Sequence, residues 1–255
     1  FSYDDYVYNG HLFSAAAGHG PRSVSLVITP IAHNAPLLTH VVGPLYLGCK
    51  TVLSPSTDPE AVFRLIEAER VTHTFAVPAM LVAWFSSDAL ARFDLSSLEA
   101  VISGGAKVQP ELARQVGPKL GCRLANNFGM AEGFCASTRP DDPEAVVAET
   151  VGPPLSPDDE YRIVGGDGRD VDAGEMGELL VRGPYTIRGY YKAPEINREA
   201  FTADGYYRTG DMLRMDGRGN LVVEGRKKDL INRGGEKVSS EELENLLLGH
   251  PKLVN

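Results

Sequence analysis

The first 140 residues alternate between short apolar runs and stretches with helical periodicity, and this alternation limits the fold more than any other feature. The apolar runs predicted to form strands are 25–28, 49–53, 71–77, 100–102 and 122–125. Helices are predicted to begin at Asp58-Pro59, a cap followed by a first-turn proline, and to cover Pro110–Leu120, where Gly121 ends the helix. Strands that alternate with helices predict an α/β fold, a mostly parallel sheet with crossover helices.

The pattern changes near residue 150, where Pro153, Pro154 and Pro157 interrupt the chain. Short strands separated by Gly/Asp turns follow, at 161–164, 178–181, 213–215 and 221–223. This pattern predicts a small antiparallel β-barrel or sandwich. A final helix is predicted from the capping box of Ser239 and Glu242.

Composition narrows the class of protein. The 255 residues are 43% hydrophobic, enough for a sizeable core, and a net charge of −9 argues against a nucleic-acid partner. The sequence has no apolar run of the ~18–20 residues that span a bilayer, and FSYDDYVYNG lacks both a signal peptide's regions and an obvious start of a fold. We therefore expect no membrane partner and an internal piece of a longer protein. Three cysteines without a CxxC pair predict buried thiols and a reduced, cytoplasmic location.

Two glycine-containing phrases follow predicted strands. Gly104-Gly105 would let a flat ligand approach the backbone closely, although a tight strand-to-helix turn needs the same residues. In NNFGMAEG, Phe128 is suited to stacking on a base, Asn126 to pairing with a base edge, and Glu132 to holding Mg²⁺ near phosphates. A core aromatic and a solvated glutamate are the alternatives. The absence of a GxGxxG phrase after a strand disfavours a dinucleotide-dependent oxidoreductase.

Polar residues elsewhere allow binding and structural interpretations alike. His33 and Asn34 adjoin an apolar stretch, where a lone histidine is commonly structural. Asp211 is suited to accepting two ribose hydroxyls or to capping a turn. Arg226 is suited to a ribose or phosphate, or is a surface charge.

The order of the phrases carries more information than any one of them. FGMAEG (128–133), GELLVRGPYTIRGYYK (177–192), YRTGD (207–211) and GRKKDLINRGGEKV (225–238) occur in that sequence. This order resembles the adenylate-forming superfamily of acyl-CoA synthetases, adenylation domains and luciferases. With AHN and GGAK, the chain is most similar to the aryl-acid branch, the 2,3-dihydroxybenzoate- and salicylate-AMP ligases. The resemblance covers essentially all 255 residues.

The resemblance implies an enzyme that uses ATP and Mg²⁺ to adenylate an aromatic acid, then passes it to a carrier-protein phosphopantetheine thiol in siderophore or other nonribosomal peptide biosynthesis. An aryl-CoA ligase and a non-catalytic fragment that binds the acid or AMP remain alternatives. The implied domains are 1–150, the α/β part of a large N-terminal domain; 151–227, a β-barrel subdomain; and 228–255, the hinge and start of a small α+β C-terminal domain.

The resemblance also implies roles for individual residues. Glu132 would bind Mg²⁺ and the phosphates, and Lys228 would be the hinge of domain rotation, with the Gly234-Gly235 loop moving in for thioester formation. The implied nucleotide-binding residues are Gly104, Gly105, Ala106, Asn126, Phe128, Gly129, Met130, Ala131, Asp211 and Arg226. The implied acid-binding residues are His33, Asn34, Gly104 and Gly129, with Asn34 facing the substituent ortho to the carboxylate.

Departures from the family pattern set further expectations. The family's phosphate loop would precede Phe1 and its late catalytic lysine would follow Asn255, so we expect these 255 residues alone to adenylate poorly. Ala35, Leu38 and Thr39 make the expected pocket roomier or less polar than in dihydroxybenzoate enzymes. The acid therefore stays open among salicylate, a substituted salicylate, 3-hydroxyanthranilate and a hydroxypicolinate.

Overall fold

The computed structural model describes residues 2–233 and 236–239, and contacts divide the chain into two compact units, 1–157 and 158–255. The division falls a few residues beyond the change of pattern near residue 150. A further boundary at 227/228 stays a prediction.

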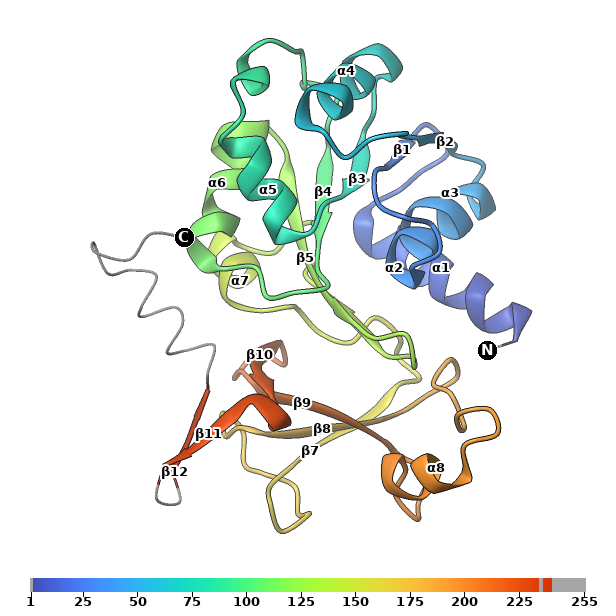
Figure 1. The fold of residues 1–255 in the computed structure, drawn as a ribbon, viewed down its shortest axis with the longest axis vertical. Helices are drawn as coiled ribbons and strands as arrows, with labels where there is room; N and C mark the ends of the chain where they lie inside the picture. Colours follow the sequence, from blue (N-terminus) through green and yellow to red (C-terminus); the bar gives the residue numbers. More distant parts are fainter. Residues whose placement is uncertain (1, 234–235, 240–255) are drawn as a thin grey trace. The chain divides into compact units, whose positions relative to one another are not determined.

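The first unit is built on a single sheet (Figure 1). Its strands are β1 (Val24–Val27), β2 (Lys50–Leu53), β3 (His73–Phe75), β4 (Ala100–Ser103), β5 (Arg123–Gly129) and β6 (Cys135–Ser137). They lie in the order β2-β1-β3-β4-β5-β6, with β1 to β5 parallel and β6 antiparallel to β5. The predicted, mostly parallel sheet is confirmed.

Helices connect the strands of this sheet. They are α1 (Tyr3–Ala17), α2 (Asn34–Leu37), the π-helical η1 (Leu38–Val42), α3 (Gly43–Tyr46), α4 (Pro59–Glu69), α5 (Pro78–Phe85), the 3-10 helix η2 (Asp88–Ala91), α6 (Pro110–Leu120) and α7 (Glu144–Glu149). The predicted caps are present: Asp58 accepts a hydrogen bond from the Ala61 amide at 3.1 Å, and Gly121 ends α6 in a left-handed conformation.

Both faces of the sheet are apolar. Successive side chains of a strand point to opposite faces, so neighbouring residues of one strand pack into different clusters. Val101 and Leu124 belong to the main core, which also contains residues of α4, α5 and α6. Ile102 and Ala125, their chain neighbours, pack instead with Ala17 of α1 in a smaller cluster. Figure 1 shows α5 and α6 on one side of the sheet and α1 to α3 on the other. The central strands β3 and β4 are thus buried from two sides, as continuous apolar runs predict, whereas the edge strand β2 is partly exposed.

Helix α1 occupies the segment in which no start of a fold was expected. Ser2 and Asp5 form a capping box at its first turn, and Gly18 ends it. Its buried residues are Asn9, Gly10, Phe13, Ser14 and Ala17. Most of these are small or polar, so the helix lacks the apolar periodicity by which buried helices are recognised. A Cβ on Gly43 of α3 would lie 2.2 Å from the Gly10 carbonyl oxygen, so the two helices cross in backbone contact.

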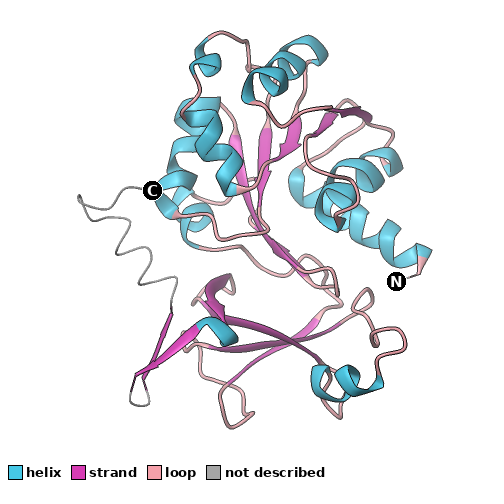
Figure 2. Ribbon diagram, in the orientation of Figure 1, coloured by secondary structure: helices cyan, strands magenta, loops and turns pink. Residues whose placement is uncertain are grey.

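The second unit contains an antiparallel sheet (Figure 2). Its strands are β7 (Glu160–Val164), β8 (Gly177–Arg182), β9 (Tyr207–Met215) and β10 (Leu221–Arg226), in the order β10-β9-β8-β7, and α8 (Pro194–Ala200) precedes β9. The antiparallel architecture is confirmed. The sheet is open, with β7 and β10 as its edges, because four strands are fewer than a filled barrel requires.

A 3-10 turn, η3 (Lys227–Asp229), follows β10 and leads into a two-stranded hairpin of β11 (Leu230–Arg233) and β12 (Glu236–Ser239). The predicted loop at Gly234-Gly235 and the predicted helix after Ser239 lie outside the described residues. Cys49, Cys122 and Cys135 are buried thiols, as expected. Within the described part of the chain, no helix has the length and apolarity needed to cross a membrane.

Candidate functional site

Three of the predicted motifs lie at one edge of the parallel sheet. The His33-Asn34 pair follows β1, the Gly104-Gly105 pair follows β4, and Phe128 lies near the end of β5, so all three are at carboxyl ends of strands. The strand order reverses direction between β1 and β3. In open α/β sheets ligands bind outside the carboxyl ends of the strands, at such a reversal. The fold therefore gathers residues that are far apart in the sequence at the edge where a ligand is expected.

The two adjacent positions, 104 and 105, are occupied by glycine for different structural reasons. A Cβ on Gly104 would lie 2.5 Å from the Asn127 carbonyl oxygen, so this position needs glycine for the packing of β4 against β5. Gly105 has a φ of +80°, and its neighbour Ala106 is exposed. Close strand packing thus accounts for Gly104 and the turn for Gly105, and the exposed backbone at Gly105 and Ala106 is accessible to a ligand.

Asn126 is buried, and its side chain forms hydrogen bonds within the first unit. Its Nδ2 donates to the backbone carbonyls of Val147 at 3.1 Å and of Thr150 at 3.0 Å, and its own amide donates to the Thr138 hydroxyl. These bonds tie β5 to the segment around α7. The predicted contact with an adenine edge stays a prediction, and it would have to use the side-chain oxygen.

Phe128 is half-buried and meets Phe134 edge to face, with ring centroids 6.5 Å apart. Phe134 is fully buried yet has a φ of +75°, a conformation that is strained for an aromatic residue. Strain of this kind persists where the surrounding structure imposes it, and it concentrates at ligand-binding turns. Along the chain, Gly129 and the turn of Met130 and Ala131 separate the two phenylalanines. A Cβ on Gly129 would lie 3.0 Å from the Cys135 sulfur.

Glu132 is a half-buried carboxylate in the same turn. The described residues contain no group of three or more His, Cys, Asp or Glu side chains able to hold a metal ion. Mg²⁺ at nucleotide sites is commonly held by one or two carboxylates together with phosphate oxygens and water. Glu132 fits that arrangement, in which the nucleotide supplies most of the ligands.

His33 and Asn34 begin α2, and both side chains make local hydrogen bonds. The exposed His33 is the N-cap, and its Nδ1 accepts from the Ala35 amide at 3.2 Å. The half-buried Asn34 accepts at Oδ1 from the Tyr6 hydroxyl of α1 at 3.2 Å. Tyr6 was not predicted from the sequence, because nothing in a helix without apolar periodicity marks one tyrosine as a partner of Asn34.

An apolar surface links Asn34 to the glycine pair. Ala35 and Val77 both pack against the small cluster of Ala17, Phe75, Ile102 and Ala125. The Val77 Cγ1 is 3.9 Å from the position that a Cβ would take on Gly105. The side chains that connect these motifs are thus apolar, as is typical of the lining of a small-molecule site.

A hollow of about 550 Å³ opens at the ends of β1 and β2, lined by 27–31 and 53–57. The predicted acid- and nucleotide-binding residues are not part of its lining.

In the second unit, Asp211 of β9 and Arg226 of β10 are cross-strand partners. The Arg226 Nε lies 3.0 Å from the Asp211 Oδ1, and the Asp211 side chain is 9% exposed against 59% for Arg226. A buried carboxylate held by an exposed guanidinium is a rigid hydrogen-bond acceptor. The structure therefore brings the two predicted ribose-binding residues together.

Lys228, the predicted hinge, is exposed in η3. Its neighbour Lys227 reaches the buried Glu178 of β8, with the Nζ 2.7 Å from the Oε2. This ion pair fixes the turn that connects Arg226 to Lys228. One sequence signal points to this pair, because Glu178 is a charged residue at the start of a predicted apolar strand.

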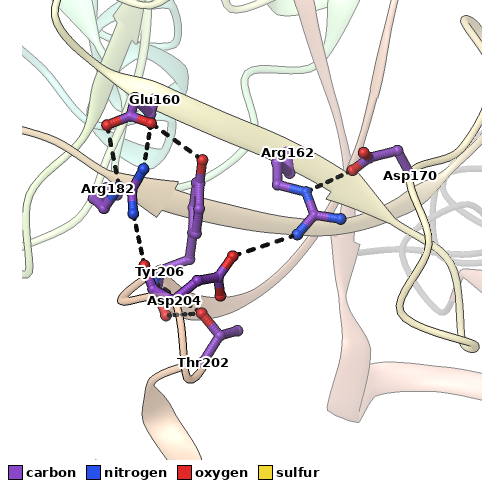
Figure 3. Close-up of polar contacts among 7 residues, drawn as sticks. All are labelled: Glu160, Arg162, Asp170, Arg182, Thr202, Asp204 and Tyr206. Atoms are coloured by element: carbon purple, nitrogen blue, oxygen red, sulfur yellow. Dashed lines mark hydrogen bonds and ion pairs between the residues drawn. The ribbon is translucent and has the colours of Figure 1, made fainter.

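A further polar cluster anchors the start of β9 (Figure 3). Arg182 binds both carboxylate oxygens of Glu160, donates to the Asp204 carbonyl, and lies 4.5 Å from the centroid of the Tyr206 ring. Hydrogen bonding to Arg182 lowers the pKa of Glu160 below its usual value. Because Tyr206 directly precedes β9, these contacts fix the beginning of the strand that carries Asp211.

Comparison with known proteins identifies the family of the chain. The model of a family described as AMP-binding enzyme matches residues 2–191, most of the chain. The chain belongs to the AMP-binding enzyme family. Two curated relatives are pyochelin synthase PchD of Pseudomonas aeruginosa, 50% identical over 98% of this chain and 46% of its own length, and 2,3-dihydroxybenzoate-AMP ligase of Bacillus subtilis, 51% identical over 98% and 47%.

A solved family structure, apo MbtA of Mycobacterium smegmatis, superposes with a TM-score of 0.83 at 42% identity, over 99% of this chain and 47% of that one. The chain spans about half the length of the curated relatives it matches.

Proposed function

We propose that this chain forms part of an enzyme that activates an aromatic carboxylic acid with ATP, giving an aryl-adenylate. The observation that carries the proposal is the gathering of three motifs at the carboxyl edge of one parallel sheet: the His33-Asn34 pair, the glycine pair with its accessible backbone, and the turn from Phe128 to Glu132. Membership of the AMP-binding family and 51% identity to an aryl-acid-AMP ligase support it.

The chemistry needs few reactive groups from the protein. An oxygen of the acid's carboxylate attacks the α-phosphorus of ATP, and the bond to pyrophosphate breaks. A thiol sulfur then attacks the acyl carbon, AMP leaves, and the thiol proton passes to solvent. Positioning and charge neutralisation dominate such reactions.

We assign the residues accordingly. Asn34, with His33 beside it, contacts the acid, and the backbone of 104–106 with Phe128 encloses the adenine. Asp211 and Arg226 hold the ribose. Glu132 helps to hold Mg²⁺, which neutralises phosphate charge when bound. The acceptor is a carrier-protein thiol, with coenzyme A as the alternative, and Lys228 is the hinge between the two half-reactions.

Pyrophosphate exchange into ATP tests the proposal. Because the chain spans about half the length of its curated relatives, the complete natural polypeptide is assayed with salicylate, 2,3-dihydroxybenzoate, benzoate, an aliphatic acid and an α-amino acid. We expect exchange that depends on the aryl acids. Exchange supported only by the aliphatic or amino acids, or by none of the panel, would contradict the proposal.

The acceptor is then tested by offering coenzyme A and a phosphopantetheinylated carrier protein to the same enzyme. We expect the carrier protein to be acylated faster. Faster acylation of coenzyme A would replace the carrier-protein assignment and leave the adenylation step intact.

A further inference from the structure

The turn before the predicted hinge is tied to the sheet of the second unit at two consecutive residues. The Arg226 Nε lies 3.0 Å from the Asp211 Oδ1 on β9. The Lys227 Nζ lies 2.7 Å from the Glu178 Oε2 on β8. Because the strand order is β10-β9-β8-β7, the two cations reach two successive strands beyond their own. The next residue, Lys228, is exposed in η3.

Glu178 is the buried member of its ion pair. Its side chain is 8% exposed, whereas that of Lys227 is 57% exposed. Strand β8 pairs with β7 on one side and with β9 on the other, so Glu178 belongs to the interior of the sheet. A buried carboxylate depends on its cation, and the loss of either partner is costly. The ion pair therefore holds the exposed turn to the sheet.

An irregularity in the pairing of β8 with β9 lies beside Glu178. The register of the two strands shifts between Glu178 and Leu180. Glu178 itself pairs with Met212, the residue after Asp211. Bulges of this kind re-aim the side chains of a strand and are common next to active sites. The carboxylates that hold the two cations thus come from neighbouring positions of the sheet.

A hinge serves two half-reactions only if one of its sides stays in place. Hinge residues absorb large changes of φ and ψ, and the segment beyond them moves as a body. A small error at the pivot displaces the reacting groups, and a misplacement of about 1 Å can slow a reaction as much as 10²-fold. Rotation about the bonds of Lys228 leaves the ion pairs of Arg226 and Lys227 intact.

We propose that Glu178 is a positioning residue for the acyl-transfer step, because through Lys227 it fixes the stationary side of the hinge and confines rotation to Lys228. The inference rests on the proposed function, in which Lys228 is the hinge between the two half-reactions. Without the ion pair the chain also turns at residue 227, and the orientation needed for transfer is reached less often. Acyl transfer follows the rotation and therefore reports on the hinge.

The first test is a double-mutant cycle in the complete polypeptide. The enzyme is loaded with aryl-adenylate, and acyl transfer to the faster acceptor is measured per adenylate bound, so inactive enzyme does not count. Glu178→Gln and Lys227→Met should each slow transfer about five- to tenfold, between the values of an exposed ion pair and of a hydrogen bond to a charged group. The double variant should be no slower than the slower single variant, since both remove one contact.

Two variants and one constant are the controls. Lys227→Arg keeps the cation and should transfer at a rate close to wild type. Asp170→Asn removes a carboxylate that pairs with Arg162 at 2.8 Å in the same unit, and it should do the same. The KM for the acid in pyrophosphate exchange should be unchanged in every variant, because the assigned acid-binding residues belong to the first unit.

Trypsin tests the anchor without an assay of activity. The bonds after Arg226, Lys227 and Lys228 are tryptic sites, and Glu178→Gln leaves all of them in place. Cleavage of a native protein requires local opening, and its rate follows the population of the open form when opening is fast. Mass spectrometry should find cleavage at these sites about five- to tenfold faster in Glu178→Gln, and unchanged in Asp170→Asn.

The outcomes separate this inference from the proposed function. Unchanged transfer in either single variant, slowing that adds up in the double variant, or unchanged cleavage at the turn overturns the role of Glu178 while aryl-acid adenylation stands. A raised KM for the acid overturns it too, because the effect would then reach the first unit. Wild-type enzyme that activates no aryl acid overturns the proposed function and the hinge role with it, while cleavage still decides whether Glu178 holds the turn.

Discussion

At the scale of single residues, the proposed site contains side chains whose polar atoms have defined partners. Asp211 is the clearest case in the second unit, because burial and Arg226 together fix its carboxylate. A carboxylate that accepts two ribose hydroxyls makes charge-assisted hydrogen bonds, which contribute about 1.5–3 kcal/mol each. The assignment of Asp211 therefore predicts a measurable dependence on the sugar.

Asp211→Asn should weaken ATP binding roughly tenfold or more, while its effect on 2′-deoxy-ATP should be smaller, because one of the two hydroxyl contacts is already missing. KM for both nucleotides in pyrophosphate exchange measures this. Asp170→Asn, which removes a carboxylate that pairs with Arg162 at 2.8 Å in the same unit, is the control and should leave both values unchanged. Equal losses for the two nucleotides in Asp211→Asn would remove the ribose assignment.

At the scale of elements, α1 and α3 cross in close backbone contact. The Gly43 Cα faces the Gly10 carbonyl, and an added Cβ would lie 2.1 Å from the Ser14 hydroxyl and 2.2 Å from that carbonyl oxygen. The neighbour on one side is helix backbone, which cannot rotate away. This crossing also keeps Tyr6 on α1 within reach of Asn34 on α2.

Gly43→Ala should therefore lower the free energy of unfolding by about 1–3 kcal/mol, the usual cost of overpacking. Urea unfolding followed by circular dichroism measures it. Gly20→Ala is the control, since a Cβ there meets no atom within 4 Å and the backbone is not left-handed. If the two variants were equally stable, the close crossing would be wrong.

The elements that the sequence predicted share a physical cause. Helices α4 and α6 were predictable because Asp58-Pro59 caps the first and Gly121 ends the second. The strands β1, β4 and β5 were predictable because each contains a mostly apolar run, which is typical of strands buried on both sheet faces. Helix α1 was missed because its buried face is made of small and polar residues, which only a close helix crossing explains.

The candidate site, too, could be predicted from the sequence only in part. Motif order marked Asn34, Gly105, Phe128 and Asp211, because each belongs to a phrase with its own chemistry. The contacts that hold the surrounding segments come from residues distant in the sequence, as with Tyr6 on Asn34 and with Lys227 on Glu178. Asn126 shows the converse, since its side-chain amide has a structural use that no sequence phrase revealed.

At the scale of the whole molecule, three buried histidines make the stability of the fold depend on pH. The rings of His19 and His73 stack with centroids 4.2 Å apart, and the His40 ring lies edge-on to His19 at 5.8 Å. Burial, together with the His73 ring and the Arg123 guanidinium, lowers the pKa of His19 to about 3, and burial together with Arg123 lowers the pKa of His73 to about 4. Burial also lowers the pKa of His40 well below its ordinary value.

The three histidines are therefore neutral in the fold and become protonated on unfolding below their unfolded-state pKa of 6.5. The free energy of unfolding should be level above that pH and should fall below it, toward pH 4, by up to about 1.4 kcal/mol per pH unit for each histidine. Urea unfolding at pH 7.5, 6.5 and 5.5 measures the slope. His73→Gln should make the slope shallower and His33→Gln, at an exposed position, should not. Stability that stays level down to pH 5 would contradict the neutral cluster.

The central claim is that a carboxylate oxygen of an aryl acid attacks the α-phosphorus of ATP. It is tested most directly with salicylate labelled with ¹⁸O in its carboxylate, incubated with ATP, the carrier protein and the complete natural polypeptide. After transfer to the thiol, mass spectrometry should find one ¹⁸O in AMP and none in pyrophosphate. Unlabelled AMP, or label in inorganic phosphate formed together with ADP, would contradict adenylation.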